Sequence, residues 1–326
     1  MAYQTGDTIL DDHYNGFANS NSPNNINKIW GTGDGTYGYG QSNTISTVSA
    51  GGEVQASQWN TLLSRMQSIA DHQGTNMTTA DSGQLVTGDP IQAILEISTD
   101  ITSFGNNRYN VAAANLTQTS NPNSVNRTFT GNWETNTIHE VSFTFASADA
   151  ARYFFNAGGK ITHVWNLSGG TADGKYNEWV DLFNTKAATF TLSANADSLS
   201  GSGSPSTNLN EGFWSSSSDD SYTVHQKQFA DTSPYTSNYC QWEVKMTGAH
   251  GDNNGIGNVV TIKATARDDA ADSDDEGSPA DASNTNLDIV NGNLSSSWTF
   301  SKPNTTQLNN DAVGTITAAE VSQTQA

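Results

Sequence analysis

The sequence predicts an α+β protein that is mainly β. A small helix-containing N-terminal module should precede an antiparallel β-sandwich-like body decorated with short helices. A low apolar content of 34% and 29 glycines favour extended structure with long polar loops over a compact helical fold. Apolar and polar residues alternate in several segments after residue 116, as half-buried strands require. A length of 326 residues is consistent with two domains, which we place at 1–115 and 116–326.

The N-terminal module should contain two short helices. The first has Ser57 as a good N-cap and Gly74 as a left-handed stop. Its apolar face is formed by Trp59, Leu62, Leu63 and Met66. The second helix is expected to start at Asp89-Pro90-Ile91, because Asp caps a helix and Pro suits its first position. Two such faces are too small for a core of their own, so they should pack on a sheet, on the next domain or on another copy.

A glycine-rich run separates the start of the chain from the first helix. Residues 33–38 match G-x-G-x-x-G in letters, but no apolar strand precedes them and no helix follows directly, as a dinucleotide site requires. We therefore interpret the run as a tight loop in which Tyr37 and Tyr39 pack inward and the glycines supply positive φ.

The second part of the chain carries the strand signals. Val141, Phe143 and Phe145 alternate with polar residues, and Ser147 should cap a helix over 148–155. Further strands are expected at 161–167, 189–192, 240–246, 260–266 and 298–300, with another short helix at 177–184. The segment after Pro303 is rich in Thr, Gln and Asn and has few charges. This composition predicts a tail that is flexible or ordered only against a neighbouring copy.

Charge and cysteine content exclude several classes of function. Thirteen Lys and Arg against 33 Asp and Glu give a net charge of −20, which repels nucleic acid and anionic membranes. No apolar stretch approaches the length of a membrane span, and residues 1–7 lack the features of a secretory signal. Cys240 is the only cysteine, so an intrachain disulfide is excluded.

One acidic segment raises the question of a metal. Asp272, Asp274 and Glu276 have the spacing of the first half of a calcium loop. Ser283 stands where such a loop needs a carboxylate, so the motif is incomplete. A loosely bound Ca²⁺ and a solvated acidic loop are the two interpretations, and the second is favoured. The histidines show no zinc-binding spacing, so we expect no cofactor.

No segment has the pattern of a catalytic centre, so we expect a protein that is not an enzyme. Gly201-Ser202-Gly203-Ser204-Pro205 differs from G-x-S-x-G at its last position. Glu211 and the pair Asp219-Asp220 leave a glycosidase-like carboxylate set open as an alternative. Exposed aromatic rings for glycan or receptor binding would be Trp214, Tyr222 and Tyr235.

Several motifs nevertheless occur in a recognisable order. Gly38-Tyr39-Gly40-Gln41, then Gln58-Trp59-Asn60 with Leu62, then His72-Gln73-Gly74 follow one another, with Ile26-Asn27-Lys28-Ile29-Trp30-Gly31 before them. Further on stands the segment Ala151-Arg152-Tyr153-Phe154-Phe155-Asn156-Ala157-Gly158-Gly159-Lys160-Ile161. The order resembles a module of virion structural proteins of tailed bacteriophages, marine cyanophages especially. The resemblance covers about residues 1–75 and, less fully, about 138–166.

The resemblance implies a virion part of the tail, baseplate or fibre, working by protein–protein assembly without catalytic residues. Partners would be copies of the chain and other virion proteins, and a trimer is our hypothesis from fibre-like habits. Tyr39, Trp59, Leu62, Leu63 and Met66 are the candidate interface residues. The alternatives are a carbohydrate-binding or depolymerising fibre protein and a capsid-surface decoration protein.

Overall fold

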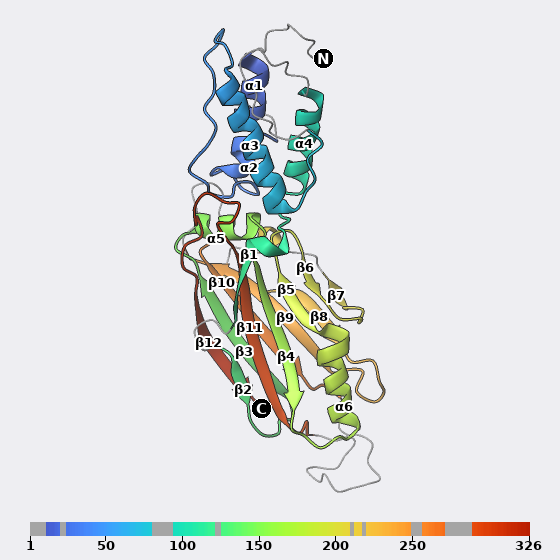
Figure 1. The fold of residues 1–326 in the computed structure, drawn as a ribbon. Coiled ribbons are helices and arrows are strands. Elements are labelled where there is room, and N and C mark those ends of the chain that lie inside the picture. Colours follow the sequence, from blue (N-terminus) through green and yellow to red (C-terminus); the bar gives the residue numbers. More distant parts are fainter. Residues whose placement is uncertain are drawn as a thin grey trace.

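The protein is α+β and mainly β. A computed structural model describes residues 11–19, 24–79, 94–120, 125–208, 212–216, 220–248, 256–270 and 289–326. A group of helices from the first third of the chain lies at one end, and the strands form a body that extends away from it (Figure 1). Helix α5 lies where the two parts meet, and the C-terminus lies toward the far end of the sheets.

Four helices make up the first part within the described residues. They are α1 (Asp11–Asn19), α2 (Ile26–Trp30), α3 (Ala56–Gln73) and α4 (Ile94–Asn106). The side chain of Gln58 accepts a hydrogen bond from the Gln55 backbone N–H (2.8 Å), so α3 begins at Ala56. Ser57, which we predicted as the N-cap, lies inside the first turn. The predicted stop is confirmed, because Gly74 adopts φ 68°. The predicted start at Asp89–Ile91 lies outside the described residues.

These helices share an apolar core. Trp59, Leu62 and Met66 of α3 are buried against residues of the other three helices. Tyr14 of α1 lies 6.3 Å from Trp59 between ring centroids, and Phe17 meets the same indole edge-on at 6.4 Å. Ala157 and Leu308 from the second part of the chain also belong to this core. The core of the helices therefore continues into the junction with the strands.

The described strands form two antiparallel sheets. The first has the order β1-β11-β4-β5-β6, with β2 also pairing β11, and the second has the order β12-β3-β10-β9-β8-β7. Strands of the first sheet are β1 (Leu116–Ser120), β2 (Arg127–Phe129), β4 (Lys160–Ser168), β5 (Thr189–Leu192), β6 (Asp197–Leu199) and β11 (Asn293–Pro303). Strands of the second are β3 (Asn136–Thr144), β7 (Thr207–Asn208), β8 (Thr223–Phe229), β9 (Tyr239–Thr247), β10 (Val259–Arg267) and β12 (Thr317–Gln325).

The predicted alternation is confirmed in the central strands. Every second residue of β3 and β9 is buried, and the predicted hairpin exists as the β9–β10 pair with Val244 opposite Ile262. Strand β5 has the predicted bounds, and β11 contains the predicted strand at 298–300. The inward-facing residues of both sheets form one large cluster rich in aromatic rings. This cluster is the core of the sandwich-like body.

Two helices connect strands in this body. In α5 (Ala148–Asn156) the Ser147 hydroxyl accepts from the Ala150 N–H (3.0 Å), which confirms the predicted cap. Helix α6 (Gly174–Asp181) runs into a π-helical turn at Leu182–Ala187, so the helix predicted at 177–184 starts earlier and ends irregularly. Asp173 caps α6 by accepting from the Tyr176 N–H (2.7 Å).

The C-terminal segment differs from the prediction of a flexible or neighbour-dependent tail. Residues 317–325 form β12 and pair with β3 of the same chain, with a register shift between Glu320 and Ser322. The Ala326 carbonyl accepts from the backbone N–H groups of Glu134 (2.9 Å) and Thr135 (2.8 Å). The segment is ordered by its own chain because β3 supplies a free strand edge. Among the described helices, none is long and apolar enough to cross a membrane.

Candidate functional site at the junction of helices and sheets

The motif residues that are distant in sequence meet at the junction between the helices and the sheets. The loop before α3 places Tyr39 inward, where it is 1% exposed. The Tyr39 hydroxyl donates to the Arg108 carbonyl (2.8 Å) and accepts from Gln73 Nε2 (2.8 Å). Gln73 Nε2 also donates to the Phe104 carbonyl (3.0 Å). The tyrosine and the end of α3 are thus tied to the end of α4.

Two side chains of α5 continue this network from the sheet side. Arg152 Nη1 donates to the Tyr37 carbonyl (2.7 Å), and its Nε pairs with Asp149 (3.0 Å). Asn156 Nδ2 donates to the Gly35 carbonyl (3.2 Å). Both side chains are fully buried. The carbonyl groups of the glycine-rich loop that they contact are therefore hydrogen-bonded to α5 and not to water. Arg152 and Asn156 are therefore polar links between the two parts.

The loop itself has the shape expected from its glycines. Gly33, Gly35, Gly38 and Gly40 all have positive φ, and no strand–turn–helix unit surrounds them. Gly40 lies directly over the ring of Tyr153, and a Cβ there would be 2.5 Å from Tyr153 Cδ2. The predicted tight loop is confirmed, and it contacts α5 through Gly40 and through the carbonyl groups of Gly35 and Tyr37.

The junction also includes His72 and the segment before β12. His72 Nε2 lies 3.1 Å from the Ala157 carbonyl, and burial lowers the pKa of His72 to about 4. The imidazole is neutral at pH 7 and donates from Nε2, so it bonds the sheet part and not its own helix. Gln41 Nε2 donates to the Asn310 carbonyl (3.1 Å), and Gln41 Oε1 accepts from the Asn310 N–H (2.8 Å). Burial raises the pKa of Tyr39.

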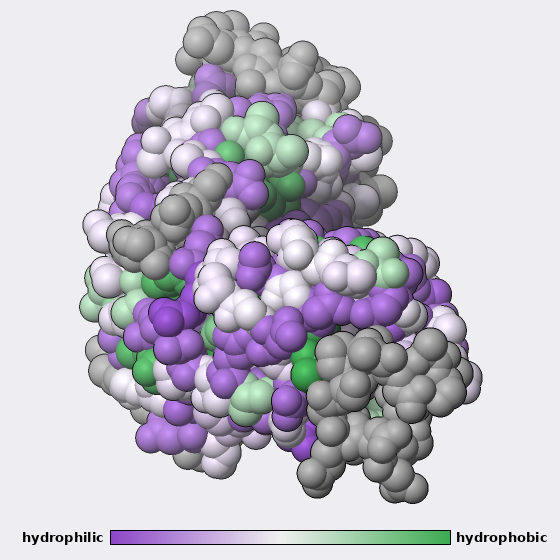
Figure 2. Space-filling model, turned by 90° about the horizontal axis from the view of Figure 1, so that it is seen from below, coloured by the Kyte–Doolittle hydropathy of each residue, from purple (hydrophilic) through white to green (hydrophobic). Residues whose placement is uncertain are grey.

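The predicted interface residues lie inside the chain. Tyr39, Trp59, Leu62, Leu63 and Met66 are all between 0% and 5% exposed. Their apolar face is covered by the neighbouring helices and by the junction, so it is not left for sister chains. Among the described residues Val321 of β12, 52% exposed, is the exposed large hydrophobic side chain. Figure 2 shows one face of the molecule, on which hydrophobic side chains form only small separate patches.

The predicted ligand-facing aromatic residues are engaged in intrachain contacts. Tyr235 is 4% exposed and therefore buried, which corrects the expectation of an exposed ring. Trp214 is partly buried, and its Nε1 donates to Asn156 Oδ1 (2.9 Å). The Tyr222 hydroxyl donates to Glu140, and the ammonium groups of Lys245 and Lys263 lie over its ring, each 4.5 Å from the centroid. The side chains of Trp214 and Tyr222 are both partly exposed.

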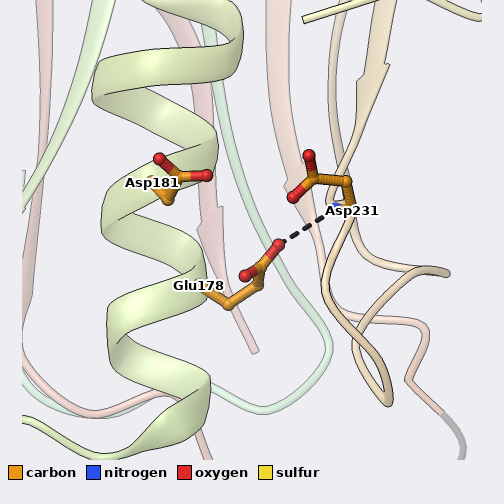
Figure 3. Close-up of side chains that lie close together, drawn as sticks. All are labelled: Glu178, Asp181 and Asp231. Carbon is orange, nitrogen blue, oxygen red and sulfur yellow. Dashed lines mark hydrogen bonds between the residues drawn. The ribbon is translucent and has the colours of Figure 1, made fainter.

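The proposed cation ligands Asp272, Asp274 and Glu276 lie outside the described residues, as do Glu211 and Asp219. Within the described part of the chain, one acidic group has a compact arrangement, formed by Glu178, Asp181 and Asp231 (Figure 3). Glu178 Oε1 accepts from the backbone N–H groups of Asp231 (3.0 Å) and Thr232 (3.1 Å). Lys186 Nζ lies 2.6 Å from Asp231 and 3.6 Å from Asp181.

This acidic group has its own counter-charge. The hydrogen bond from Lys186 to Asp231 raises the pKa of the lysine, which keeps its ammonium charged. The ammonium lies beside two of the three carboxylates, and Glu178 is used to hold a turn. The arrangement is therefore that of an ion-pair network around α6.

A Ser–His–Asp arrangement lies at one edge of the sandwich, and no sequence motif predicts it. His225 Nδ1 is 2.7 Å from Asp197 Oδ2, and His225 Nε2 is 3.1 Å from Ser216 Oγ. These distances match those of a nucleophilic triad. However, Ser216 is only 6% exposed, and its hydroxyl also contacts the Gly212 carbonyl (3.0 Å). We interpret the three residues as a polar tie between β6 and β8.

A second buried polar network joins the two sheets. Ser296 Oγ lies 2.7 Å from both His139 Nδ1 and His163 Nε2. Trp242 Nε1 donates to His163 Nδ1 (2.9 Å), and Trp298 Nε1 donates to His139 Nδ1 (3.1 Å). Indole N–H groups only donate, so both Nδ1 atoms are acceptors and both neutral rings carry hydrogen on Nε2. His163 is therefore hydrogen-bonded through both of its ring nitrogens.

Charge in this network is suppressed by burial. Burial lowers the pKa of His139 to about 4, partly offset by Glu320, whose Oε2 lies 3.3 Å from His139 Nε2. Burial also lowers the pKa of His163. Both rings are neutral at pH 7, as a structural bridge between two apolar sheets requires.

Comparisons with protein-family models, curated proteins and solved structures found no match to this chain. The junction is the best-defined candidate site among the described residues, and its buried hydrogen bonds hold the helices against the sheets. Arg108 and Asn310 were missed by sequence reasoning, since each is a single polar residue in a loop without a pattern.

Proposed function

We propose that the chain is a structural component of a tailed phage virion, in the tail, baseplate or fibre, and that it acts by protein–protein assembly and not by catalysis. The observation that carries the proposal is where the phage-like motifs lie. Five residues of these motifs form hydrogen bonds in the buried junction, namely Tyr39, His72, Gln73, Arg152 and Asn156. Residues of that kind fix an orientation between two bodies.

A fixed orientation suits a protein that transmits position within a particle. The helical part and the sheets are joined by an arginine, two amide side chains and a shared apolar core. Desolvated hydrogen bonds of this type are costly to break one at a time. The proposal needs no cofactor.

The partners in this proposal are copies of the same chain, with a trimer as the hypothesis, and other virion proteins. Since the predicted apolar face is buried within the chain, assembly has to use polar surfaces. Polar contacts of low individual affinity become firm when several engage together. The net charge of −20 favours neighbours that present basic surfaces or bound cations.

The experiment is the location and copy number of the chain in purified particles of the phage that encodes it. Quantitative peptide mass spectrometry should recover the chain in a fixed ratio to the major capsid protein, and antibody labelling should mark the tail. Labelling of heads would instead support a capsid-surface decoration protein. Particles that contain no peptide of the chain would refute a virion role.

A carbohydrate-binding or depolymerising fibre protein is the second candidate, and a polar groove favours it. The groove has a volume of about 760 Å³ beside α2 and is lined mainly by amide, hydroxyl and charged groups, including Lys28, Asp34 and Thr47. Such groups can bond sugar hydroxyls. Two lining amides are already used, because Asn25 caps α2 and Asn27 bonds the Ile45 backbone in both directions.

Lys28 and Asp34 provide the test of this second candidate. Their ion pair (3.2 Å) is on the surface, so replacing both with alanine should leave the fold intact. Binding to a host-envelope glycan panel that the double variant loses would support carbohydrate recognition. Release of reducing sugar would show depolymerising activity, and absence of binding by the wild-type chain would exclude this candidate.

A further inference from the structure

A lysine and an aspartate are buried together at the base of α6. Lys175 Nζ contacts Asp268 Oδ2, and each side chain is only 2% exposed. Lys175 lies in the first turn of α6, between β4 and β5 of the first sheet. Asp268 directly follows β10, in the middle of the second sheet. An ion pair at this depth lacks the hydration that makes surface pairs inexpensive to maintain.

The backbone holds both residues in place. The start of α6 is fixed by Asp173, which caps the helix and also accepts from Asn291 Nδ2 (2.5 Å). The Asp268 N–H donates to the Thr135 carbonyl (2.9 Å). The next two N–H groups, of Asp269 and Ala270, donate to Asn238 Oδ1 (2.9 and 2.7 Å). The amine and the carboxyl group are therefore kept in contact by structure on either side.

Burial makes the carboxyl group of this pair easier to protonate than an ordinary aspartate. Burial raises the pKa of Asp268 to about 6, although Lys175 opposes the shift. Transfer of one proton from the ammonium to the carboxylate converts the ion pair into a neutral amine and a neutral carboxylic acid. Burial disfavours the charged carboxylate, which favours this proton transfer from the side of Asp268. A neutral amine is a nucleophile, and a neutral carboxylic acid is an acceptor for it.

We propose that Lys175 and Asp268 condense to an amide, so that the folded chain carries an intramolecular isopeptide bond between them. The lone pair of Nζ attacks Cγ of Asp268, and the N–C bond forms. The C–OH bond then breaks, and the hydroxyl leaves with a proton from the nitrogen as one molecule of water. The step requires no oxidant, reductant or activated reagent. Contact between the two groups replaces a bimolecular encounter, which is the source of large effective molarities.

The bond would tie the two sheets covalently. It would link α6, which lies between β4 and β5 of the first sheet in the chain, to the end of β10 in the second sheet, and would close the chain between residues 175 and 268. A chain with one cysteine has no disulfide route to such a link. The proposal stands apart from the virion role, since it depends only on the geometry of this pair.

The test is the mass of the intact, full-length chain after unfolding in denaturant. The wild-type chain should be lighter than its sequence by one water molecule. Asp268→Ala should restore the full mass. The matched control Asp269→Ala, at the adjacent exposed carboxylate, should keep the loss of water.

Trypsin digestion locates the bond, because cyclisation of an aspartate elsewhere also releases water. The expected product joins a peptide uncut at Lys175, residues 161–186, to the peptide that begins at Asp268. A wild-type chain of full mass after prolonged incubation at pH 6, with Lys175 cleaved normally by trypsin, would overturn the proposal. Loss of water without the joined peptides would overturn it equally, and Lys175–Asp268 would then be an ion pair only.

Discussion

Gly40→Ala is expected to weaken the joint between the helices and the sheets. Gly40 has φ +72°, and its missing Cβ would lie 2.5 Å from Tyr153 Cδ2 and 2.6 Å from the Ala312 Cβ. The first of these atoms belongs to α5 and the second to the segment before β12. A methyl group at this position therefore has no room unless the two parts of the molecule separate slightly.

The magnitude has two contributions. A non-glycine residue in the left-handed region costs about 1–2 kcal/mol. Overpacking of a well-packed interface adds about 1–3 kcal/mol. Gly35→Ala is the matched control, because Gly35 also has positive φ (+48°) but its Cβ would meet no atom within 4 Å. Gly40→Ala should thus lower the free energy of unfolding by about 1–3 kcal/mol more than Gly35→Ala does.

Urea denaturation of both variants, followed by tryptophan fluorescence and far-ultraviolet circular dichroism, measures this difference. Tryptophan residues lie in both parts, so loosening of the joint should also separate the two transitions. Equal destabilisation by Gly40→Ala and Gly35→Ala would refute the close packing of the loop on α5. In that case the joint would depend on its hydrogen bonds alone.

Three further predictions concern buried reactive groups. The folded-state pKa values of His72 and His139 are about 4, below the ordinary 6.5, so the unfolded chain binds more protons between these values. The contribution of these neutral histidines to the free energy of unfolding is complete above pH 6.5. It is lost as the pH falls toward 4, by about 2 kcal/mol per histidine between pH 7 and 5. Urea titrations at several pH values should show this slope, and His72→Gln, a neutral donor, should reduce it; an unchanged slope would contradict the assignment. Ser216 should not react with a fluorophosphonate probe in the folded protein, because its hydroxyl is covered; labelling that Ser216→Ala removes would show a working nucleophile and contradict a purely structural role. Burial raises the pKa of the Cys240 thiol, so a thiol reagent should modify it only in denaturant; rapid modification of the native chain would show that β9 opens readily.

Much of the architecture followed from local patterns. Alternation in β3 and β9 revealed which residues face the core, because the two sheets bury one face of each strand. The serine that caps α5 was also evident, since the required hydrogen bond is local. Strand β12 was missed because Ala318 is its one well-buried residue, and its pairing with β3 depends on a free edge far away in sequence.

The junction and the polar ties were less accessible to sequence reasoning. The glycine-rich loop was interpreted correctly as a tight loop, but its partners Arg152 and Asn156 lie more than a hundred positions away. The Ser216–His225–Asp197 contact has no characteristic spacing, and it exists only because β6 and β8 meet at an edge. The apolar face of α3 was found correctly, whereas the surface that covers it depends on tertiary packing.

The Ser296 bridge restricts how this protein can change during evolution. Each hydrogen in the path from Trp242 through His163 and Ser296 to His139 has a single partner. Loss of the serine hydroxyl would leave the His163 Nε2–H without an acceptor and beyond the reach of water, whereas His139 Nδ1 would keep its bond from Trp298. Substitutions at these positions are therefore tolerated together or not at all, and variation among descendants of this chain should appear there as coordinated replacement by apolar side chains.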